Sequence, residues 1–300
     1  MKLTRFRSDL ILLALAFAWG AAFIAQKTAM AKVGPMTFIG LRFLIVAIVA
    51  APFAVLEWPA ARAASPKAWR LIGIAALFFA AGGLIQQVGM TVTTVTNAGF
   101  LTTLYVVMIP LAVWGLDRTA PRLTVIAAAI VSFIGLNLLG GGSVSALNWG
   151  DFLIIATALM ISFNIIFISK VMREAVLPAT LALVQAGATA AIALPAALLF
   201  EAPSVPAVIS AGPELLFTGV IAGGIAFTLQ GIAQRHTPPS DAAIIMGSES
   251  LWSAMLAYAL IGERLSTISL VGAGLIVLAI LLVEAGPLFF PGRPVRRPAP

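Results

Sequence analysis

The feature that most constrains this chain is a series of unbroken apolar blocks. LILLALAFAWGAAFIA near the start and LVGAGLIVLAILLV near the end contain no charged residue. A run of about 20 apolar residues is long enough to cross the hydrocarbon core of a bilayer as an α-helix. A transmembrane β-barrel would instead alternate apolar and polar residues over about ten positions. The sequence therefore predicts an all-α integral membrane protein.

The composition supports this class. Hydrophobic residues make up 61% of the 300 positions and charged residues only 10%, whereas soluble domains have roughly 45–50% and 25%. The chain has no cysteine, which excludes disulfides, thiol catalysis and thiolate metal sites. Nothing in the sequence indicates a cofactor or a metal.

Apolar blocks separated by Gly, Pro and charged residues predict ten transmembrane helices. The segment TVTTVTNAG is the weakest of the separators and leaves counts of nine and eleven open. The predicted helices cover residues 9–30, 35–56, 70–91, 96–116, 122–139, 151–172, 178–200, 214–234, 241–261 and 266–285.

The basic residues predict the orientation, because cytoplasmic loops of membrane proteins are enriched in Lys and Arg. Of the 18 Lys and Arg, 14 fall in segments on the side that holds both termini. Only Lys32 and Arg264 fall on the other side, and Lys27 and Arg42 lie within apolar helices. We therefore expect both termini in the cytoplasm and a multi-pass protein of the inner membrane.

The basic start MKLTRFRSD before an apolar run also fits a secretory signal peptide. That run is long enough to span, however, and a counterpart of it recurs later in the chain. We therefore interpret it as a retained first helix.

The two halves of the chain resemble each other. A shift of 142 or 143 residues aligns the first five predicted helices with the last five, and GGGSVSALNWG forms the junction. This predicts one repeat at 1–144 and another at 145–285, followed by a disordered, basic, Pro-rich cytoplasmic tail at 286–300. The aligned pairs are Asp9 with Asp151, Lys27 with Lys170, Pro35 with Pro178, Pro52 with Pro195, and Gln87 with Gln230.

Five is an odd number, so two repeats with the same fold would enter the membrane from opposite faces. Inverted repeats around a central cavity are typical of secondary transporters that work by alternating access. Small residues such as Gly219 and Gly223, at GxxxG spacing, favour close helix contacts. Ordinary helix packing accounts for these glycines equally well.

Three motifs carry a family resemblance: ALAFAWGAAFIAQK, ESLWSAMLAYALIGERLS with Glu263 and Arg264, and LVGAGLIVLAILLVE. In this order they resemble the EamA type of the drug/metabolite transporter superfamily, over essentially the whole chain. Many relatives have Glu-Pro in the ninth helix where this chain has Glu249-Ser250. The resemblance implies a ten-helix exporter of amino acids or related metabolites, and the chain is most similar to YddG-type exporters of aromatic amino acids.

Glu249 is the first candidate for substrate binding, because a charge within a membrane helix is costly unless it faces a partner, water or a cavity. It lies about two residues from the centre of the predicted ninth helix. It would accept hydrogen bonds from a substrate ammonium group or take up a proton. The alternative is a polar contact that only holds helices together.

Arg42 could bind a substrate carboxylate with both arms of its guanidinium. It lies nearer the outer face, so extension of the side chain to the interface is the alternative. The same alternative applies to Lys27 and Lys170 near their helix ends.

Aromatic and amide side chains away from the helix ends complete the candidates. Trp19, Tyr105 and Trp252 offer flat apolar surfaces with a polar edge, and a structural hydrogen bond between helices is the alternative for each amide. The remaining candidate substrate-binding residues are Gln86, Asn97, Asn164, Gln230 and Ser248.

Other functions fit the sequence less well. Gly247-Ser248 lacks the GxSxG pattern of a serine hydrolase, and His236 is predicted far from Ser248. The chain has no GxxxxGK[ST] loop for ATP. We therefore expect a protein that is not an enzyme and has no nucleic-acid partner. Its expected partners are membrane lipid and a small-molecule substrate. The sequence leaves the oligomeric state open, and a monomer could suffice. An exporter of lipophilic organic cations or of another metabolite class remains an alternative, as does a pore-type channel.

Overall fold

The computed structural model of the chain describes residues 4–93, 95–118, 120–139, 148–261 and 266–289. Within these ranges every regular element is a helix. Eight helical segments there are long and apolar enough to cross a membrane, and two shorter apolar helices, Leu123–Leu138 and Thr267–Val283, accompany them. The prediction of an all-α membrane protein is confirmed.

Each predicted segment matches one helix or a run of adjoining helical elements to within a few residues, and the segments 96–116, 214–234 and 241–261 are each divided. In chain order they are α1 Arg5–Met30, α2 Pro35–Leu56, α3 Trp58–Ala63, α4 Pro66–Gly89, α5 Val95–Thr102, α6 Tyr105–Asp117, α7 Leu123–Leu139, α8 Trp149–Glu174, α9 Pro178–Phe200, α10 Val205–Ser210, α11 Gly212–Leu216, η1 Phe217–Ile225, α12 Ala226–Gln234, α13 Pro239–Met246, α14 Glu249–Ile261 and α15 Thr267–Phe289.

Proline sets several of these starts. Pro35, Pro66, Pro178 and Pro239 occupy the first positions of α2, α4, α9 and α13. Proline is favoured there because its fixed φ suits a helix and its missing N–H would have had no partner within the helix. The starts of α2 and α9 were therefore predicted to the residue.

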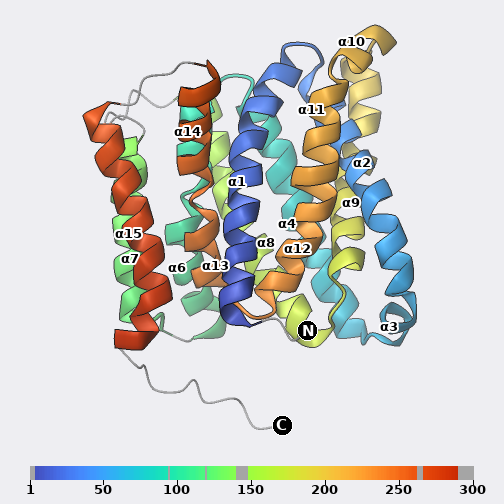
Figure 1. Cartoon of the computed structure of the whole chain (residues 1–300). Coiled ribbons are helices and arrows are strands. Elements are labelled where there is room, and N and C mark those ends of the chain that lie inside the picture. Colours follow the sequence, from blue (N-terminus) through green and yellow to red (C-terminus); the bar gives the residue numbers. More distant parts are fainter. Residues whose placement is uncertain (1–3, 94, 119, 140–147, 262–265, 290–300) are drawn as a thin grey trace.

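The helices stand side by side, and α1 begins at the same end of the molecule at which α15 ends (Figure 1). We call this end, at the bottom of the figure, the lower end. Helices α7 and α15 pack together at one edge, and α2 and α9 at the other. Helices α1, α4, α6, α8, α12, α13 and α14 lie between these pairs, where the candidate site is found.

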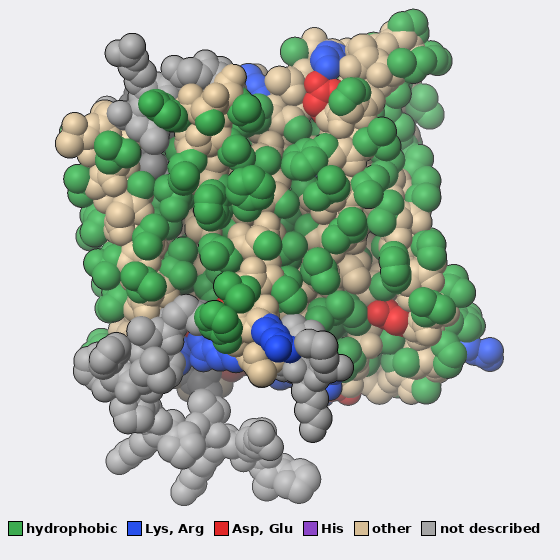
Figure 2. Space-filling view, viewed as in Figure 1, with side chains coloured by type: hydrophobic (Ala, Val, Ile, Leu, Met, Phe, Trp, Pro, Cys, Tyr) green, Lys and Arg blue, Asp and Glu red, His purple; other side chains and the backbone are tan. Residues whose placement is uncertain are grey.

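The outer surface is apolar. Large side chains such as Leu56, Leu123 and Phe200 are about four-fifths exposed, and Figure 2 shows hydrophobic side chains over most of the visible face. Charged side chains are confined to the margins of that face. Such a surface is suited to contact with lipid, as the composition predicts.

Two carboxylates cap the N-termini of α2 and α9. Glu201, just after α9, accepts hydrogen bonds from the backbone N–H groups of Met36 and Thr37 at 2.7 Å each. Glu57, just after α2, does the same for Ala179 and Thr180 at the start of α9, at 3.0 and 2.8 Å. Each helix of the pair therefore supplies, at its end, the acceptor that satisfies the first N–H groups of the other.

Glycines permit close contact between α2 and the π-helix η1, which lies between α11 and α12. A Cβ added to Gly223 would lie 2.4 Å from Cγ2 of Val46, and one added to Gly219 would lie 2.7 Å from Cγ2 of Ile45. The interpretation of these glycines as packing residues is therefore confirmed for this pair.

We predict that Gly20→Ala destabilises the protein. A Cβ at Gly20 would lie 2.7 Å from both the carbonyl oxygen of Glu249 and Cβ of Trp252, so α1 would have to move away from α14. Overpacking of this kind costs about 1–3 kcal/mol. The thermal unfolding midpoint of the detergent-solubilised protein should fall. Gly73→Ala is the matched control, because nothing lies within 4 Å of its added Cβ. Equal midpoints for the two variants would contradict the prediction.

Candidate functional site

Two membrane spans are interrupted at corresponding places. Thr103 and Leu104 form a turn between α5 and α6, and Gly247 and Ser248 form one between α13 and α14. The second turn forms without the proline of many relatives. Glu249 is therefore the first residue of α14. It lies near the middle of the span Pro239–Leu260, as predicted, but the helix is interrupted there and not continuous. A helix N-terminus carries a partial positive charge, which favours a carboxylate there.

Tyr105 and Glu249 meet between these two interruptions. The Tyr105 hydroxyl donates a hydrogen bond of 3.1 Å to Oε1 of Glu249, and the two residues are 144 positions apart. Both side chains are buried. Beside them, the hydroxyls of Thr103 and Ser250 share a hydrogen bond of 2.6 Å. The first residues of α6 and α14 are thus joined in the interior of the bundle.

A cavity of about 120 Å³ lies next to this pair. Its walls come from α1, α2, α4, α5, α6, α8, α12, α13 and α14. The lining residues of α1 are Trp19, Ala22, Phe23 and Gln26, all in the half of the helix farther from the lower end. The cavity therefore extends from mid-span toward the upper end.

Four aromatic rings form one wall. Phe79 packs edge-on against Phe43 and Phe227, with ring centroids 5.2 and 5.0 Å apart. Trp19 lies 5.9 Å from Phe227, and its indole N–H donates to the carbonyl of Ala222 in η1 at 2.9 Å. The rings therefore pack against one another, and the cavity presents an apolar aromatic surface.

Amide side chains supply neutral polar groups. Asn164 donates to the carbonyl of Ala75 at 2.9 Å, and Gln86 donates to the hydroxyl of Thr102 at 3.1 Å. Gln26 is buried, and its side-chain oxygen has no hydrogen-bond partner among the described residues. That oxygen is therefore an acceptor that a bound molecule could use.

Arg42 brings a positive charge to the same cavity. It is only 7% exposed, lines the cavity, and does not extend to the interface. The centre of its guanidinium lies 5.2 Å from the centroid of the Phe43 ring. Its Nε has no hydrogen-bond partner, and no carboxylate lies within 4.0 Å in the described part of the chain.

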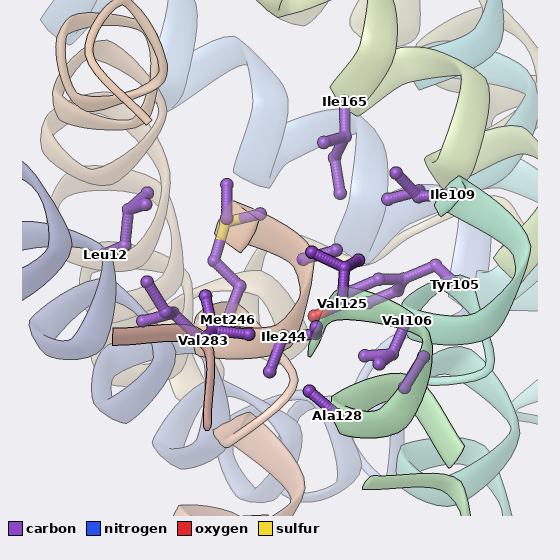
Figure 3. Close-up of a cluster of buried hydrophobic side chains, with 14 of the residues drawn as sticks. Leu12, Tyr105, Val106, Ile109, Val125, Ala128, Ile165, Ile244, Met246 and Val283 are labelled. Atoms are coloured by element: carbon purple, nitrogen blue, oxygen red, sulfur yellow. The ribbon is translucent and has the colours of Figure 1, made fainter. Parts of the chain in front are cut away.

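Below the cavity the bundle is filled with apolar side chains. Leu12, Ile109 and Ile244 are fully buried there. Figure 3 shows them in one cluster with Met246 and Tyr105, two residues that also line the cavity. Leu12 precedes Trp19 by seven residues on α1, about 10 Å along the axis. The cavity is therefore closed toward the lower end by an apolar layer.

A polar cluster lies below that layer. Asp241, 1% exposed, accepts hydrogen bonds from Arg5 at 2.8 Å and Arg122 at 2.6 Å. Asp9 accepts one from the hydroxyl of Thr237 at 2.6 Å and lies 3.4 Å from Nε of Arg5. We call these five residues the lower cluster. It joins α1, α13 and the segments that precede α7 and α13.

Seven of the ten predicted site residues line the cavity, namely Trp19, Arg42, Gln86, Tyr105, Asn164, Gln230 and Glu249. Two others do not: Trp252 packs edge-on against Phe17 at 5.4 Å, and the Ser248 hydroxyl donates to the carbonyl of Ile245 within the turn. The side chain of Asn97 lies outside the described part of the chain.

The sequence reasoning missed several lining residues. Gln26 was overlooked because it lies close to the end of its apolar run, and Gln87 because only its neighbour Gln86 was chosen. The phenylalanines at 43, 79 and 227 gave no signal, since Phe is common throughout this chain. The adjacent pair Gln86-Gln87 in an apolar helix was the one local sign that could have extended the set.

Comparisons with known proteins agree with this architecture. An uncharacterized transporter of Archaeoglobus fulgidus is 31% identical over 289 residues, covering 93% of this chain and 86% of the relative. The uncharacterized inner membrane transporter YedA of Escherichia coli K12 is 26% identical, covering 98% and 97%. A crystal structure of a protein with 20% identity has the same fold, with a TM-score of 0.79 over 96% of this chain and 100% of that one.

A family description matches the chain twice. The profile of the EamA-like transporter family covers residues 6–141 and again residues 148–285. The two matches leave only the ends and a short junction uncovered, and they agree with the resemblance carried by the three motifs. The chain therefore belongs to the EamA-like transporter family.

Proposed function

We propose that this protein is a secondary transporter that exports small metabolites, foremost amino acids including aromatic ones, across the inner membrane by alternating access. The observation that carries the proposal is the joined pair Tyr105 and Glu249, at two interrupted spans beside a cavity that also holds Arg42. Interrupted helices at corresponding positions of two halves are typical of transporter binding sites.

Several contacts support two inverted repeats, at 1–144 and 145–285. Asp9 accepts a hydrogen bond from Thr237, and Asp151 accepts one from Thr93. Each aspartate lies in the first turns of the first helix of its half, and each threonine lies in the opposite half. The carboxylates of Glu57 and Glu201, 144 positions apart, are related in the same way. The double match of the family profile agrees with this duplication.

The charge distribution supports cytoplasmic termini. Basic residues of the described loops, including Arg62, Lys67, Arg70 and Arg173, lie where α3, α4 and α8 begin or end at the lower end. An excess of Lys and Arg marks the cytoplasmic side. We therefore assign the lower end to the cytoplasm, and the name of the YedA relative supports the inner membrane.

The cavity supports a small zwitterionic substrate. Its volume of about 120 Å³ is below the roughly 300–1,000 Å³ of drug-sized pockets, so a metabolite fits better than a large drug. Glu249 can accept hydrogen bonds from an ammonium group, Arg42 can donate to a carboxylate, and the aromatic wall can contact an apolar side chain. The second candidate substrate is a small lipophilic cation, which Glu249 and the aromatic rings would also bind.

We predict that Glu249→Gln slows export roughly tenfold or more. The variant replaces the carboxyl group by an amide, and a hydrogen bond to a charged group such as a substrate ammonium contributes about 1.5–3 kcal/mol. The measurement is counterflow of a panel of amino acids and organic cations in proteoliposomes. Flux that saturates and exchanges supports a carrier, whereas unsaturable conductance supports a pore.

The control for this variant is Glu174→Gln. Glu174 pairs with the largely exposed Lys67 at the lower end, and exposed ion pairs contribute little to stability. Its transport rate should equal that of the wild type. Wild-type rates for Glu249→Gln would contradict the proposed role of Glu249.

We predict that Asp241→Asn opens the lower side of the cavity. Asp241 accepts from both Arg5 and Arg122, and an amide cannot hold two guanidinium groups equally well. The chain contains no cysteine, so Leu15→Cys, in the apolar layer, supplies a single labelling site. An impermeant thiol reagent applied from the lower side should label it several-fold faster in the Asp241→Asn background.

Two controls separate opening from unfolding. Asp117→Asn removes a carboxylate that pairs with Lys170 outside the lower cluster, and it should leave the labelling rate unchanged. The reagent applied from the upper side should not label faster in either background. An unchanged rate from the lower side for Asp241→Asn would rule out the lower cluster as a barrier.

A further inference from the structure

Arg42 is a buried basic side chain that forms no ion pair among the described residues, unlike five other basic residues. Arg5 and Arg122 pair with Asp241, and Lys32, Lys67 and Lys170 each pair with a carboxylate. Arg42 is buried within a membrane span and has no carboxylate partner within 4.0 Å among the described residues. A charge at this depth is costly unless a cavity or a partner compensates it. The cavity that Arg42 lines can admit water or a ligand.

The guanidinium of Arg42 and the carboxyl group of Glu249 are held apart. Both residues line the cavity, but Arg42 belongs to α2 and Glu249 to α14, and the two form no ion pair within 4.0 Å. Glu249 bonds to Tyr105 instead. The cavity thus holds one guanidinium group and one carboxyl group that form no ion pair with each other. This arrangement is complementary to a solute with two opposite charges.

The contact between Arg42 and Phe43 also favours a carboxylate over an organic cation in the cavity. The guanidinium of Arg42 lies over its ring, 5.2 Å from the centroid, so that ring face is already occupied by a cation. An organic cation entering the cavity would meet a like charge and would lack this ring face as a binding surface. A carboxylate would instead meet donors in a fork that can form two parallel hydrogen bonds.

From these contacts we infer that Arg42 determines selectivity, admitting solutes that carry a carboxylate and rejecting organic cations of the same shape. This inference rests on the proposed function and narrows it to zwitterions, against the lipophilic cations that Glu249 and the aromatic rings alone would accept. Arg42 is the residue that separates the two candidate substrate classes.

The test compares solutes that share one apolar body. They are the best-transported amino acid of the counterflow panel, its decarboxylated amine and its deaminated acid; for phenylalanine these are phenethylamine and 3-phenylpropionate. Uptake into proteoliposomes is measured above that into protein-free liposomes. The wild-type protein should carry the amino acid at least about tenfold faster than the amine.

Arg42→Gln should change the ratio of amino-acid to amine uptake by at least about tenfold in favour of the amine. Glu249→Gln should shift preference the other way, toward the deaminated acid. Arg42→Lys keeps the positive charge but cannot donate two parallel hydrogen bonds to one carboxylate. It should therefore still reject the amine while carrying the amino acid more slowly. Arg70→Gln, an exposed arginine at the lower end, is the matched control and should behave as the wild type.

The outcomes separate this inference from the proposed function. If the wild type carries the amino acid but Arg42→Gln leaves the uptake ratio unchanged, the selectivity role is overturned and the export function stands. If Arg42→Gln loses all uptake while its thermal unfolding midpoint matches that of the wild type, Arg42 is needed for transport in general and does not select. A wild-type protein that carries amines and no amino acids overturns both proposals.

Discussion

The structure depends on one constraint: hydrocarbon offers no hydrogen-bond partner, so the chain must satisfy its own polar groups. The start of each helix leaves backbone N–H groups without partners within the helix. At α2 and α9 these groups are satisfied by Glu201 and Glu57, each supplied by the opposite helix. Helix capping and helix pairing are therefore one interaction here, and α2 cannot leave α9 without exposing both sets of N–H groups.

The same constraint accounts for the placement of the site. Interrupting a helix inside a bilayer is tolerated where the freed groups are buried in protein or face a cavity. Here both interruptions lie in the interior, where Thr103 and Ser250 bond across the gap and Tyr105 bonds to Glu249. The polar groups of the two turns thus stabilise each other. They also bring a carboxylate to the wall of a cavity whose lining is otherwise largely apolar.

Much of the fold could be predicted from the sequence, because apolar blocks and helix-starting prolines determine where spans begin and end. The second and seventh segments, 35–56 and 178–200, coincide with α2 and α9. The interruptions could not be predicted, since Gly247-Ser248 resembles many small-residue pairs that remain helical. The EamA resemblance is confirmed by the family match. The likeness to aromatic amino acid exporters, the count of ten helices and the orientation of the termini stay predictions.

The faces of the helices were harder to predict than their ends. Uniformly apolar helices have little periodicity from which to infer a buried face. Trp252 and Trp19 were therefore both predicted as binding residues, because each lies near the middle of its predicted helix. The structure places Trp19 in the cavity and Trp252 against Phe17. Charged residues were easier, because a buried charge has few places to be compensated. Both Glu249 and Arg42 were found for that reason.

The lower cluster concentrates its bonds on one side chain. Asp241 holds Arg5, near the start of the chain, and Arg122, just before α7, so a single carboxylate joins three segments that are distant in sequence. Bonds that share an acceptor are not broken independently, because withdrawing α13 removes Asp241 from both arginines at once. Only Arg5 keeps a carboxylate neighbour, Asp9, on its own helix. Separation at this end therefore breaks the contacts to Arg5 and Arg122 together.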